Sequence, residues 1–267
     1  AHGFLLLSDL GRQTVIERLD PADPHAAAPW YREATQVLLR WQQVSRPGVL
    51  PPYDAALLHR ELALFPEWYV ARHRQVVLSD AQQQVLRAAF ERIVAENLQA
   101  PSVYVHRDFM MRNLMAPALG TGVSPLGVLD FQDAVYGPIT YDVASLLRDA
   151  FISWDEDFVL DITVRYWEQA RKAGLLGAAS ASGWGDDFGA FYRSVEWMGL
   201  QRHLKVAGIF ARLGLRDGKA KYLQDTPRFI GYIRATARRY RELAPLARLI
   251  DQIEGDAAPV GYAFGRM

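Results

Sequence analysis

Apolar residues recur at helical spacing along much of the chain. In residues 31–44 the apolar side chains stand three or four positions apart, at Ala34, Val37, Leu38, Trp41 and Val44. This spacing puts them on one face and predicts a helix over 31–44. Residues 21–29 and 46–54 contain several prolines, and we expect both to be loops. A second helix is expected over 55–65, ending before Pro66.

A third helix is predicted to begin just after Ser79. Ser79 and Gln82 have the spacing of a capping box, in which each side chain accepts a hydrogen bond from the other residue's backbone N–H. One apolar face follows, made of Val85, Leu86, Ala89, Phe90, Ile93 and Val94. The helix should therefore bury this face against the core.

The middle of the chain has a different pattern. Short apolar or β-branched segments occupy 102–105, 114–115 and 126–129, the last two separated by a Gly-, Pro- and Ser-rich turn at 117–125. These segments predict small β elements, with polar residues on the loops between them.

The two ends of the chain complete the predicted fold class. Residues 3–7 form an apolar run before a turn signal and read as a strand, whereas the pattern from 141 onward is helical, with breaks at 174–185 and 213–218. The sequence therefore predicts a mostly helical α+β protein with small β-hairpin elements in its middle.

Charge and composition exclude several classes of protein. The 267 residues include 30 Lys plus Arg and 30 Asp plus Glu, so the formal net charge is zero. This balance argues against a general nucleic-acid binder or a membrane-surface protein. The absence of Cys excludes disulfides, thiolate catalysis and Cys-based zinc sites. No apolar run reaches the roughly 18 residues of a membrane span, so we expect a soluble cytoplasmic protein.

The strongest chemical signal is a polar loop after the strand at 102–105. His106, Asp108 and Asn113 follow the pattern H-x-D-x-x-x-x-N, and Asp130 ends the later strand at 126–129. Phosphoryl transfer needs a carboxylate that orients the acceptor hydroxyl and accepts its proton, and oxygen ligands for the Mg²⁺ ion on the phosphates. A loop offering Asp and Asn beside a second Asp supplies both.

With this motif, the chain resembles the kinase-like phosphotransferases, in the branch of the aminoglycoside phosphotransferases and choline kinases. More narrowly, it resembles the bacterial anomeric N-acetylmuramate/N-acetylglucosamine kinases of cell-wall recycling in segments 3–11, 61–68, 106–113 and 197–206. The resemblance implies the C-terminal lobe of a kinase-like fold. It also implies ATP-dependent phosphorylation, assisted by Mg²⁺, of the anomeric hydroxyl of a small amino sugar, by a monomer.

The resemblance also implies roles for the residues of the loop. Asp108 would be the catalytic base, and Asn113 and Asp130 would be the Mg²⁺ ligands. His106 would brace the catalytic loop. Asp142, at the start of the next helix, would accept hydrogen bonds from the backbone of that loop.

Further residues around the nucleotide are implied in the same way. Arg112 would steady phosphate charge, with a salt bridge inside the loop as the alternative. Asp9, Leu10 and Gly11 would form the hinge whose backbone meets the adenine. Met110 replaces the Lys that eukaryotic-type protein kinases usually have two positions after the catalytic Asp, which favours a small-molecule kinase.

Four polar residues are candidates for the sugar site. Glu61 could contact sugar hydroxyls, or be a structural cap or a surface charge. Arg202, His203 and Lys205 could contact the substrate or phosphate, or form the solvated face of a helix. Because N-acetylmuramate carries a carboxylate, this basic group favours the sugar acid over a polycationic aminoglycoside.

The sequence departs from the family pattern at its N-terminal end. Residues 1–171 contain no Lys, and the chain has neither the strand Lys nor the glycine-rich loop with which such kinases hold phosphates. We therefore expect residues 1–11 to be the last strand and hinge of a missing N-terminal lobe, and 12–267 to be the C-terminal lobe. A fragment of this kind should be inactive or nearly so.

Two other functions remain open from the sequence. One is an aminoglycoside or aminoalcohol kinase, which would need carboxylates in its acceptor pocket. The other is a non-catalytic binding module derived from a kinase. Retention of Asp108, Asn113 and Asp130 together argues against the second.

Overall fold

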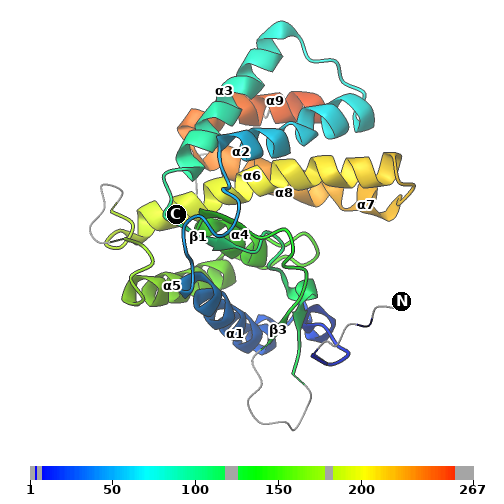
Figure 1. Cartoon of the computed structure of the whole chain (residues 1–267). Coiled ribbons are helices and arrows are strands. Elements are labelled where there is room, and N and C mark those ends of the chain that lie inside the picture. Colours follow the sequence, from blue (N-terminus) through cyan, green and yellow to red (C-terminus); the bar gives the residue numbers. More distant parts are fainter. Residues whose placement is uncertain (1–3, 5–7, 118–125, 178–182, 256–267) are drawn as a thin grey trace, which may run out of the picture. The chain divides into compact units, whose positions relative to one another are not determined.

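The structure is a computed structural model that describes residues 4, 8–117, 126–177 and 183–255. The chain divides into two compact units (Figure 1). The first unit comprises residues 1–53 and 100–195, and the second comprises 54–99 and 196–267. The predicted strand at 3–7 and turn at 117–125 lie almost wholly outside the described residues. The predicted domain boundary after residue 11 stays a prediction.

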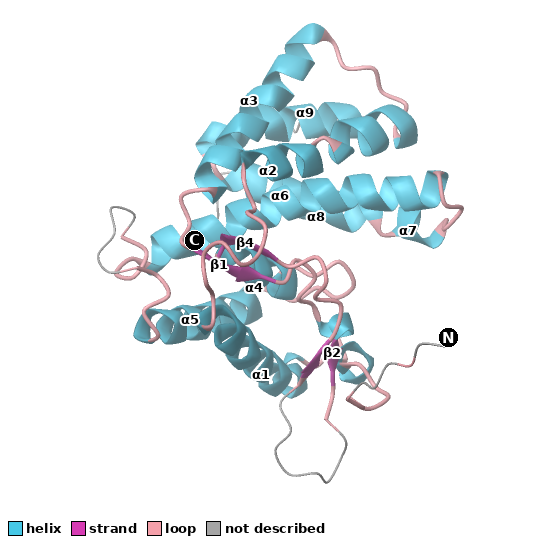
Figure 2. Ribbon diagram, viewed as in Figure 1, coloured by secondary structure: helices cyan, strands magenta, loops and turns pink. Residues whose placement is uncertain are grey.

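The first unit combines helices with two small sheets (Figure 2). Its elements are η1 (Val15–Arg18), α1 (Pro24–Gln43), β1 (Ser102–Val105), η3 (Met111–Asn113), β2 (Leu114–Met115), β3 (Gly127–Val128), β4 (Val135–Pro138), α4 (Thr140–Leu147) and α5 (Glu156–Lys172). Helix α6 (Phe188–Leu215) begins in this unit and continues into the second. Helices α1 and α5 pack side by side.

Helix α1 begins earlier than its apolar pattern predicts. The predicted loop at 21–29 is wrong from Pro24 onward, because the helix starts there. Asp23 caps it by accepting a hydrogen bond from Ala26 N at 2.9 Å, and Pro24 suits the first helical position because its missing N–H has no partner to lose. Pro29 lies inside the helix, at the cost of one backbone hydrogen bond.

The two sheets hold the loops of the middle region. Strand β1 pairs with β4 and β2 pairs with β3, both antiparallel. Strand β4 was not predicted, because Gly and Pro are depleted in strands. Gly137 is required there, since a side chain would overlap Tyr53 Cβ. Tyr53 N donates to Tyr136 O at 2.8 Å, so the 51–53 segment covers the other edge of β4.

The regular elements of the second unit, within its described residues, are all helices, joined by loops. Its elements are α2 (Ala55–Leu62), the π-helix η2 (Phe65–His73), α3 (Asp80–Asn97), the later part of α6, α7 (Lys221–Gln224), α8 (Thr226–Arg239), η4 (Arg241–Leu243) and α9 (Ala244–Glu254). Helix α9 packs beside α3 and α8, and α2 beside α3.

One local prediction is confirmed and one is wrong in the helices predicted at 55–65 and after Ser79. The capping box is confirmed: Gln82 N donates to Ser79 Oγ at 3.3 Å, and Ser79 N donates to Gln82 Oε1 at 3.0 Å. The predicted end of helical structure before Pro66 is wrong. Helix α2 ends at Leu62, but η2 then carries the chain through Pro66, which occupies one of its first two positions, where a proline is tolerated.

Candidate active site

The turn after β1 is held by one buried carboxylate. Asp142, in the first turn of α4, is fully buried and accepts hydrogen bonds from His106 N at 2.7 Å and Arg107 N at 3.0 Å. These are the contacts with the loop backbone that the resemblance implied. Arg107 has φ +76°, in the left-handed region. The Asp142 carboxylate thus stabilises a strained turn directly before Asp108.

Asp108 itself is fixed through its backbone. Its carbonyl oxygen accepts hydrogen bonds from Met110 N at 3.0 Å and from Asn113 Nδ2 at 2.9 Å. Asn113 N donates to Met110 O at 2.8 Å, which closes the loop on itself. The Asp108 side chain is half-buried. The loop that presents this carboxylate is therefore held by hydrogen bonds within the loop itself.

Asp130 is tied to the same loop through its neighbour. Leu129 N donates to Asn113 O at 2.9 Å, directly before Asp130. Asp130 has φ +68° and is exposed, and its Oδ1 accepts a hydrogen bond from Gln132 Nε2 at 2.6 Å. The structure therefore joins the segment that carries Asp130 to the loop that carries Asp108 and Asn113.

His106 is the buried residue of the same loop. Its side chain is 1% exposed and lies edge-on to Trp41 and Phe109. Burial lowers the pKa of His106 below its usual value of 6.5. Three smaller effects oppose this shift, in decreasing order: the charge of Asp108, the Leu129 backbone and the charge of Asp130. The charges of both carboxylates thus act on the same imidazole.

The predicted metal ligands suit a hard cation. The Asn113 amide donates through Nδ2, which leaves Oδ1 as an acceptor, and Asp130 adds carboxylate oxygen. Mg²⁺ is commonly bound by one or two carboxylates together with substrate phosphates and water. The described residues include no group of three or more His, Cys, Asp or Glu that could hold a metal ion.

Arg112 and the predicted hinge also belong to this unit. The Arg112 guanidinium lies 4.6 Å from the ring centroid of Phe151, in a cation–π contact. In the hinge, Gly11 N donates to Asp9 Oδ1 at 2.9 Å, and Leu10 lies against Gly127 of β3. The predicted hinge therefore lies beside the first residue of β3, and the chain that leaves β3 reaches Asp130 two residues later. The functions of these residues stay predictions.

The predicted sugar-site residues lie in the second unit and are paired there. Glu61 Oε1 accepts a hydrogen bond from Lys205 Nζ at 2.8 Å, and Glu61 Oε2 accepts one from Gln201 Nε2 at 2.9 Å. Glu61 is 4% and Lys205 9% exposed. Glu61 is therefore not a surface charge, and that alternative is wrong.

The neighbouring basic residues are buried as well. Arg202 and His203 are 5% and 3% exposed, so the solvated-face alternative is also wrong. His203 stacks on Tyr232, with ring centroids 4.6 Å apart. Neither Gln201 nor Tyr232 was singled out from the sequence. Gln201 stands four positions before Lys205 and so shares its face of α6, a signal that could have identified it.

Comparisons with known proteins agree with this chemistry. Residues 1–176 match the family described as "Phosphotransferase enzyme family". The N-acetylmuramate/N-acetylglucosamine kinase of Neisseria meningitidis serogroup B is 50% identical over 264 residues, covering 98% of this chain and 75% of the relative. The protein of the same name from Pseudomonas putida is 45% identical over 256 residues, covering 96% and 71%.

The fold has relatives among solved structures. An ethanolamine kinase from Plasmodium vivax superimposes with a TM-score of 0.54 at 14% identity, over 82% of this chain and 61% of that one. This likeness concerns the fold alone, and it confirms the predicted mostly helical, kinase-like fold. Within the described residues, no helix is long and apolar enough to cross a membrane. The family match and the two curated relatives together show that the chain belongs to the phosphotransferase enzyme family.

Proposed function

We propose that the protein is an ATP-dependent kinase that phosphorylates the anomeric hydroxyl of N-acetylmuramate and N-acetylglucosamine. The observation that carries this proposal is the loop in which Asp142 and Asn113 fix the backbone on either side of Asp108. The names of relatives that are 45–50% identical support the choice of sugar.

In this proposal Asp108 accepts the proton of the sugar hydroxyl as that oxygen attacks phosphorus. The two hydrogen bonds at the Asp108 carbonyl restrict the loop. The loop therefore loses little conformational entropy when the transition state forms. Positioning of this kind is a large part of phosphoryl-transfer catalysis.

Asn113 Oδ1 and the Asp130 carboxylate would hold Mg²⁺. When bound, ATP supplies the phosphoryl group and the metal ion neutralises charge on its phosphates. The bond from Leu129 N to Asn113 O keeps the two ligand-bearing segments together. Arg112 would contribute positive charge beside the phosphates, and Asp9, Leu10 and Gly11 would receive the adenine.

Glu61, Arg202, His203 and Lys205 stay proposed determinants of the sugar site. Glu61 and Lys205 already neutralise each other, so free charge on Lys205 does not explain a preference for a carboxylate. We propose that this pair shapes the acceptor site by fixing α2 against α6, and that Arg202 favours the lactyl carboxylate of N-acetylmuramate. On this basis Arg202→Ala should weaken the binding of N-acetylmuramate more than the binding of N-acetylglucosamine.

A substrate panel tests the proposal. The complete gene product that contains residues 1–267 is incubated with ATP, Mg²⁺ and either N-acetylmuramate, N-acetylglucosamine or kanamycin, with Asp108→Asn as the inactive control. We expect both N-acetyl sugars, and not kanamycin, to be phosphorylated, with the new phosphate at the anomeric carbon by ³¹P NMR. Preferred phosphorylation of kanamycin would instead make the protein an aminoglycoside kinase.

We also propose that the protein works in the cytoplasm, where ATP is available, and as a monomer. Size-exclusion chromatography with light scattering measures its mass directly. A stable dimer at micromolar concentration would overturn the second statement.

A further inference from the structure

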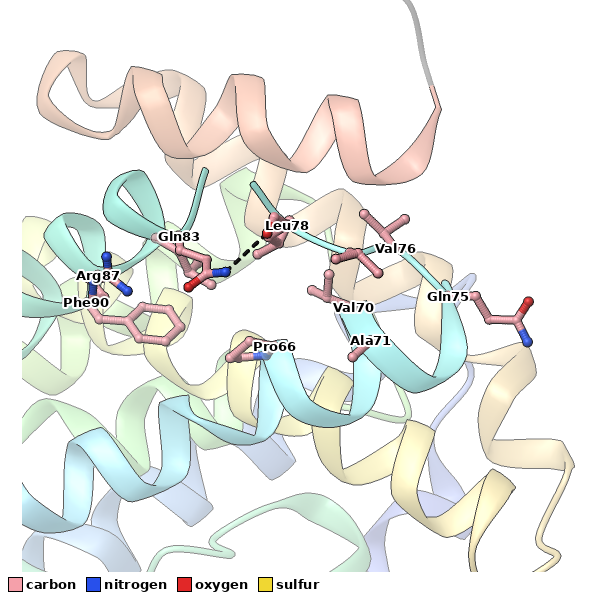
Figure 3. Close-up of a pocket in the computed structure, with 11 residues that line it drawn as sticks. Pro66, Val70, Ala71, Gln75, Val76, Leu78, Gln83, Arg87 and Phe90 are labelled. Atoms are coloured by element: carbon pink, nitrogen blue, oxygen red, sulfur yellow. Dashed lines mark hydrogen bonds between the residues drawn. The ribbon is translucent and has the colours of Figure 1, made fainter. Parts of the chain in front are cut away.

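The second unit contains a pocket that is lined by none of the residues assigned to the proposed kinase activity. Its volume is about 510 Å³, and it lies among η2, the 75–78 segment and α3 (Figure 3). Ligand sites typically have volumes of about 300–1,000 Å³ and are lined mainly by apolar side chains. Pro66 and Val70 of η2, Leu78 of the segment, and Leu86 and Phe90 of α3 give this pocket such a lining.

The backbone around the pocket is unusual. Its floor is the π-helix η2, nine residues long, and π-helical turns are rare and frequent at functional sites. Gln75, at the edge of the pocket, has φ +56°. Among the described residues, the other non-glycine positions with positive φ are Arg107 and Asp130, both in the candidate active site. Non-glycine residues with a left-handed backbone conformation are frequent at active sites and ligand-binding sites.

Local hydrogen bonds hold this conformation. Arg74 N donates to Tyr69 O at 2.9 Å and Val76 N donates to Val70 O at 3.1 Å, so the chain on both sides of Gln75 is tied back to η2. Gln83 Nε2 donates to Leu78 O at 3.1 Å, which fixes the far wall (Figure 3). The pocket walls are thus held by hydrogen bonds of the chain itself.

One charged side chain lines the pocket. Arg87 lies beside Phe90 at one end of the pocket, and Gln75 is at the opposite end (Figure 3). Arg87 is exposed, and within the described part of the chain its guanidinium has no ion pair or hydrogen bond. The nearby carboxylate of Glu91 instead lies 3.6 Å from His59 Nε2. An unpaired guanidinium beside an apolar pocket can bind one carboxylate, sulfonate or phosphate group.

We propose that this pocket binds an amphipathic small molecule with an apolar body and a single anionic head. The body lies against Val70, Leu78 and Phe90, and the head contacts Arg87. The apolar lining supplies most of the affinity, and the guanidinium gives the preference for an anion.

Two fluorescent probes separate these contributions. 1-Anilinonaphthalene-8-sulfonate has an apolar body with one anionic head, and N-phenyl-1-naphthylamine is its uncharged counterpart. Each probe is titrated against the folded protein and three variants. Arg87→Gln removes the proposed anion contact, Ala71→Trp fills the pocket from an exposed position on η2, and Arg92→Gln removes an exposed charge of α3 that does not line the pocket.

The expected pattern is specific to the pocket. Arg87→Gln should lower the affinity for the sulfonate probe about fivefold, because one partly exposed charge contact is worth about that much. The affinity for the neutral probe should stay unchanged. Ala71→Trp should weaken both probes at least about tenfold, and Arg92→Gln should change neither. If circular dichroism shows Ala71→Trp unfolded, Ala71→Leu replaces it, with a smaller loss expected for both probes.

Three results would overturn the proposal. The first is no saturable binding of the sulfonate probe to the folded protein. The second is undiminished binding of both probes after Ala71 is enlarged. The third is an equal loss of the sulfonate probe in Arg87→Gln and Arg92→Gln, which would show general attraction to surface charge.

Discussion

The two polar clusters of this protein satisfy their groups in opposite ways. In the loop around Asp108, hydrogen bonds fix the backbone, and within the described residues the Asp108 and Asp130 carboxylates make no hydrogen bond other than that of Asp130 Oδ1 with the neighbouring Gln132. In the cluster of Glu61, Gln201 and Lys205, the Glu61 carboxylate accepts a hydrogen bond from each of the other two side chains, and all three are buried. The first arrangement prepares groups for an outside partner, whereas the second fixes helices.

This difference predicts different results from mutation. A change at Asp108 should lower the rate of phosphorylation without lowering stability, because the described residues include no hydrogen-bond or ion-pair partner of its carboxylate. A change in the buried cluster should lower stability first, because it leaves a charge or amide unpaired away from water. Comparing rate with unfolding free energy in each variant therefore tests the contrast.

The largest expected effect is that of Asp108→Ala on activity. We expect kcat to fall by about 10²–10⁴-fold, the usual contribution of a positioned general base, while the urea midpoint stays near that of the wild type. Steady-state kinetics and urea unfolding are measured on the same preparation. Turnover close to wild type would show that Asp108 is not the base.

Next in size is the loss of stability in Glu61→Gln. Removing one partner of a buried ion pair typically costs about 3–5 kcal/mol of unfolding free energy, here because Lys205 loses its anion. Urea unfolding is measured for Glu61→Gln, for Lys205→Met and for the double variant. The three unfolding free energies together give the coupling free energy of the pair.

The double variant should be more stable than Glu61→Gln alone, since it removes the uncompensated charge. Strict additivity of the two losses would show that the pair is not coupled. An unchanged stability combined with a raised KM for the sugar would instead make Glu61 a direct substrate contact.

Asp142→Asn should act on both readouts. The replacement leaves one side-chain oxygen for two backbone N–H donors, so we expect a loss of about 1–3 kcal/mol in unfolding free energy. The kcat should also fall, because the turn before Asp108 loosens. Asp155→Asn is a control in the same unit, since Asp155 also accepts a hydrogen bond from a backbone N–H, that of Phe158 at the start of α5, outside the 106–113 loop. Equal losses of kcat in the two variants would argue against a role for Asp142 in the loop.

The smallest effect is the pH dependence contributed by His106. Burial keeps the folded-state pKa below 6.5, so the folded protein resists protonation that the unfolded chain accepts. Stability should therefore fall as pH decreases below about 6.5, by up to about 1.4 kcal/mol per pH unit. Urea unfolding in metal-free buffer at pH 7.5, 6.5 and 5.5 measures this, and His106→Gln should show a smaller decline. An identical decline in the variant would assign it to other groups.

The same contrast explains what the sequence could predict. The spacing of His106, Asp108 and Asn113 depends on one continuous loop, so a local motif is enough to find it. The same holds for the capping box of Ser79 and Gln82. The pairing of Glu61 with Lys205 joins residues 144 positions apart, and no local pattern indicates which charges meet or that both are buried.

Elements that break local preferences were missed for a related reason. Strand β4 contains Gly137 and Pro138, and only the contact of Tyr53 with its edge explains why glycine is needed there. Helix α1 begins at Pro24 because Asp23 caps it, a signal that the prolines around it obscured. Tertiary contacts and caps outweigh propensity at these places.

The most direct test of the account compares Asp130→Asn with Asp133→Asn in the complete gene product. Both aspartates are exposed and lie three positions apart on one loop, but only Asp130 is assigned to Mg²⁺. The measurement is kcat for N-acetylmuramate phosphorylation as a function of Mg²⁺ concentration. We predict a loss of about 10²–10³-fold in Asp130→Asn, as for removal of an electrostatic contact to a transition state, and near wild-type turnover in Asp133→Asn. Wild-type turnover in Asp130→Asn, or equal losses in both variants, would contradict the account.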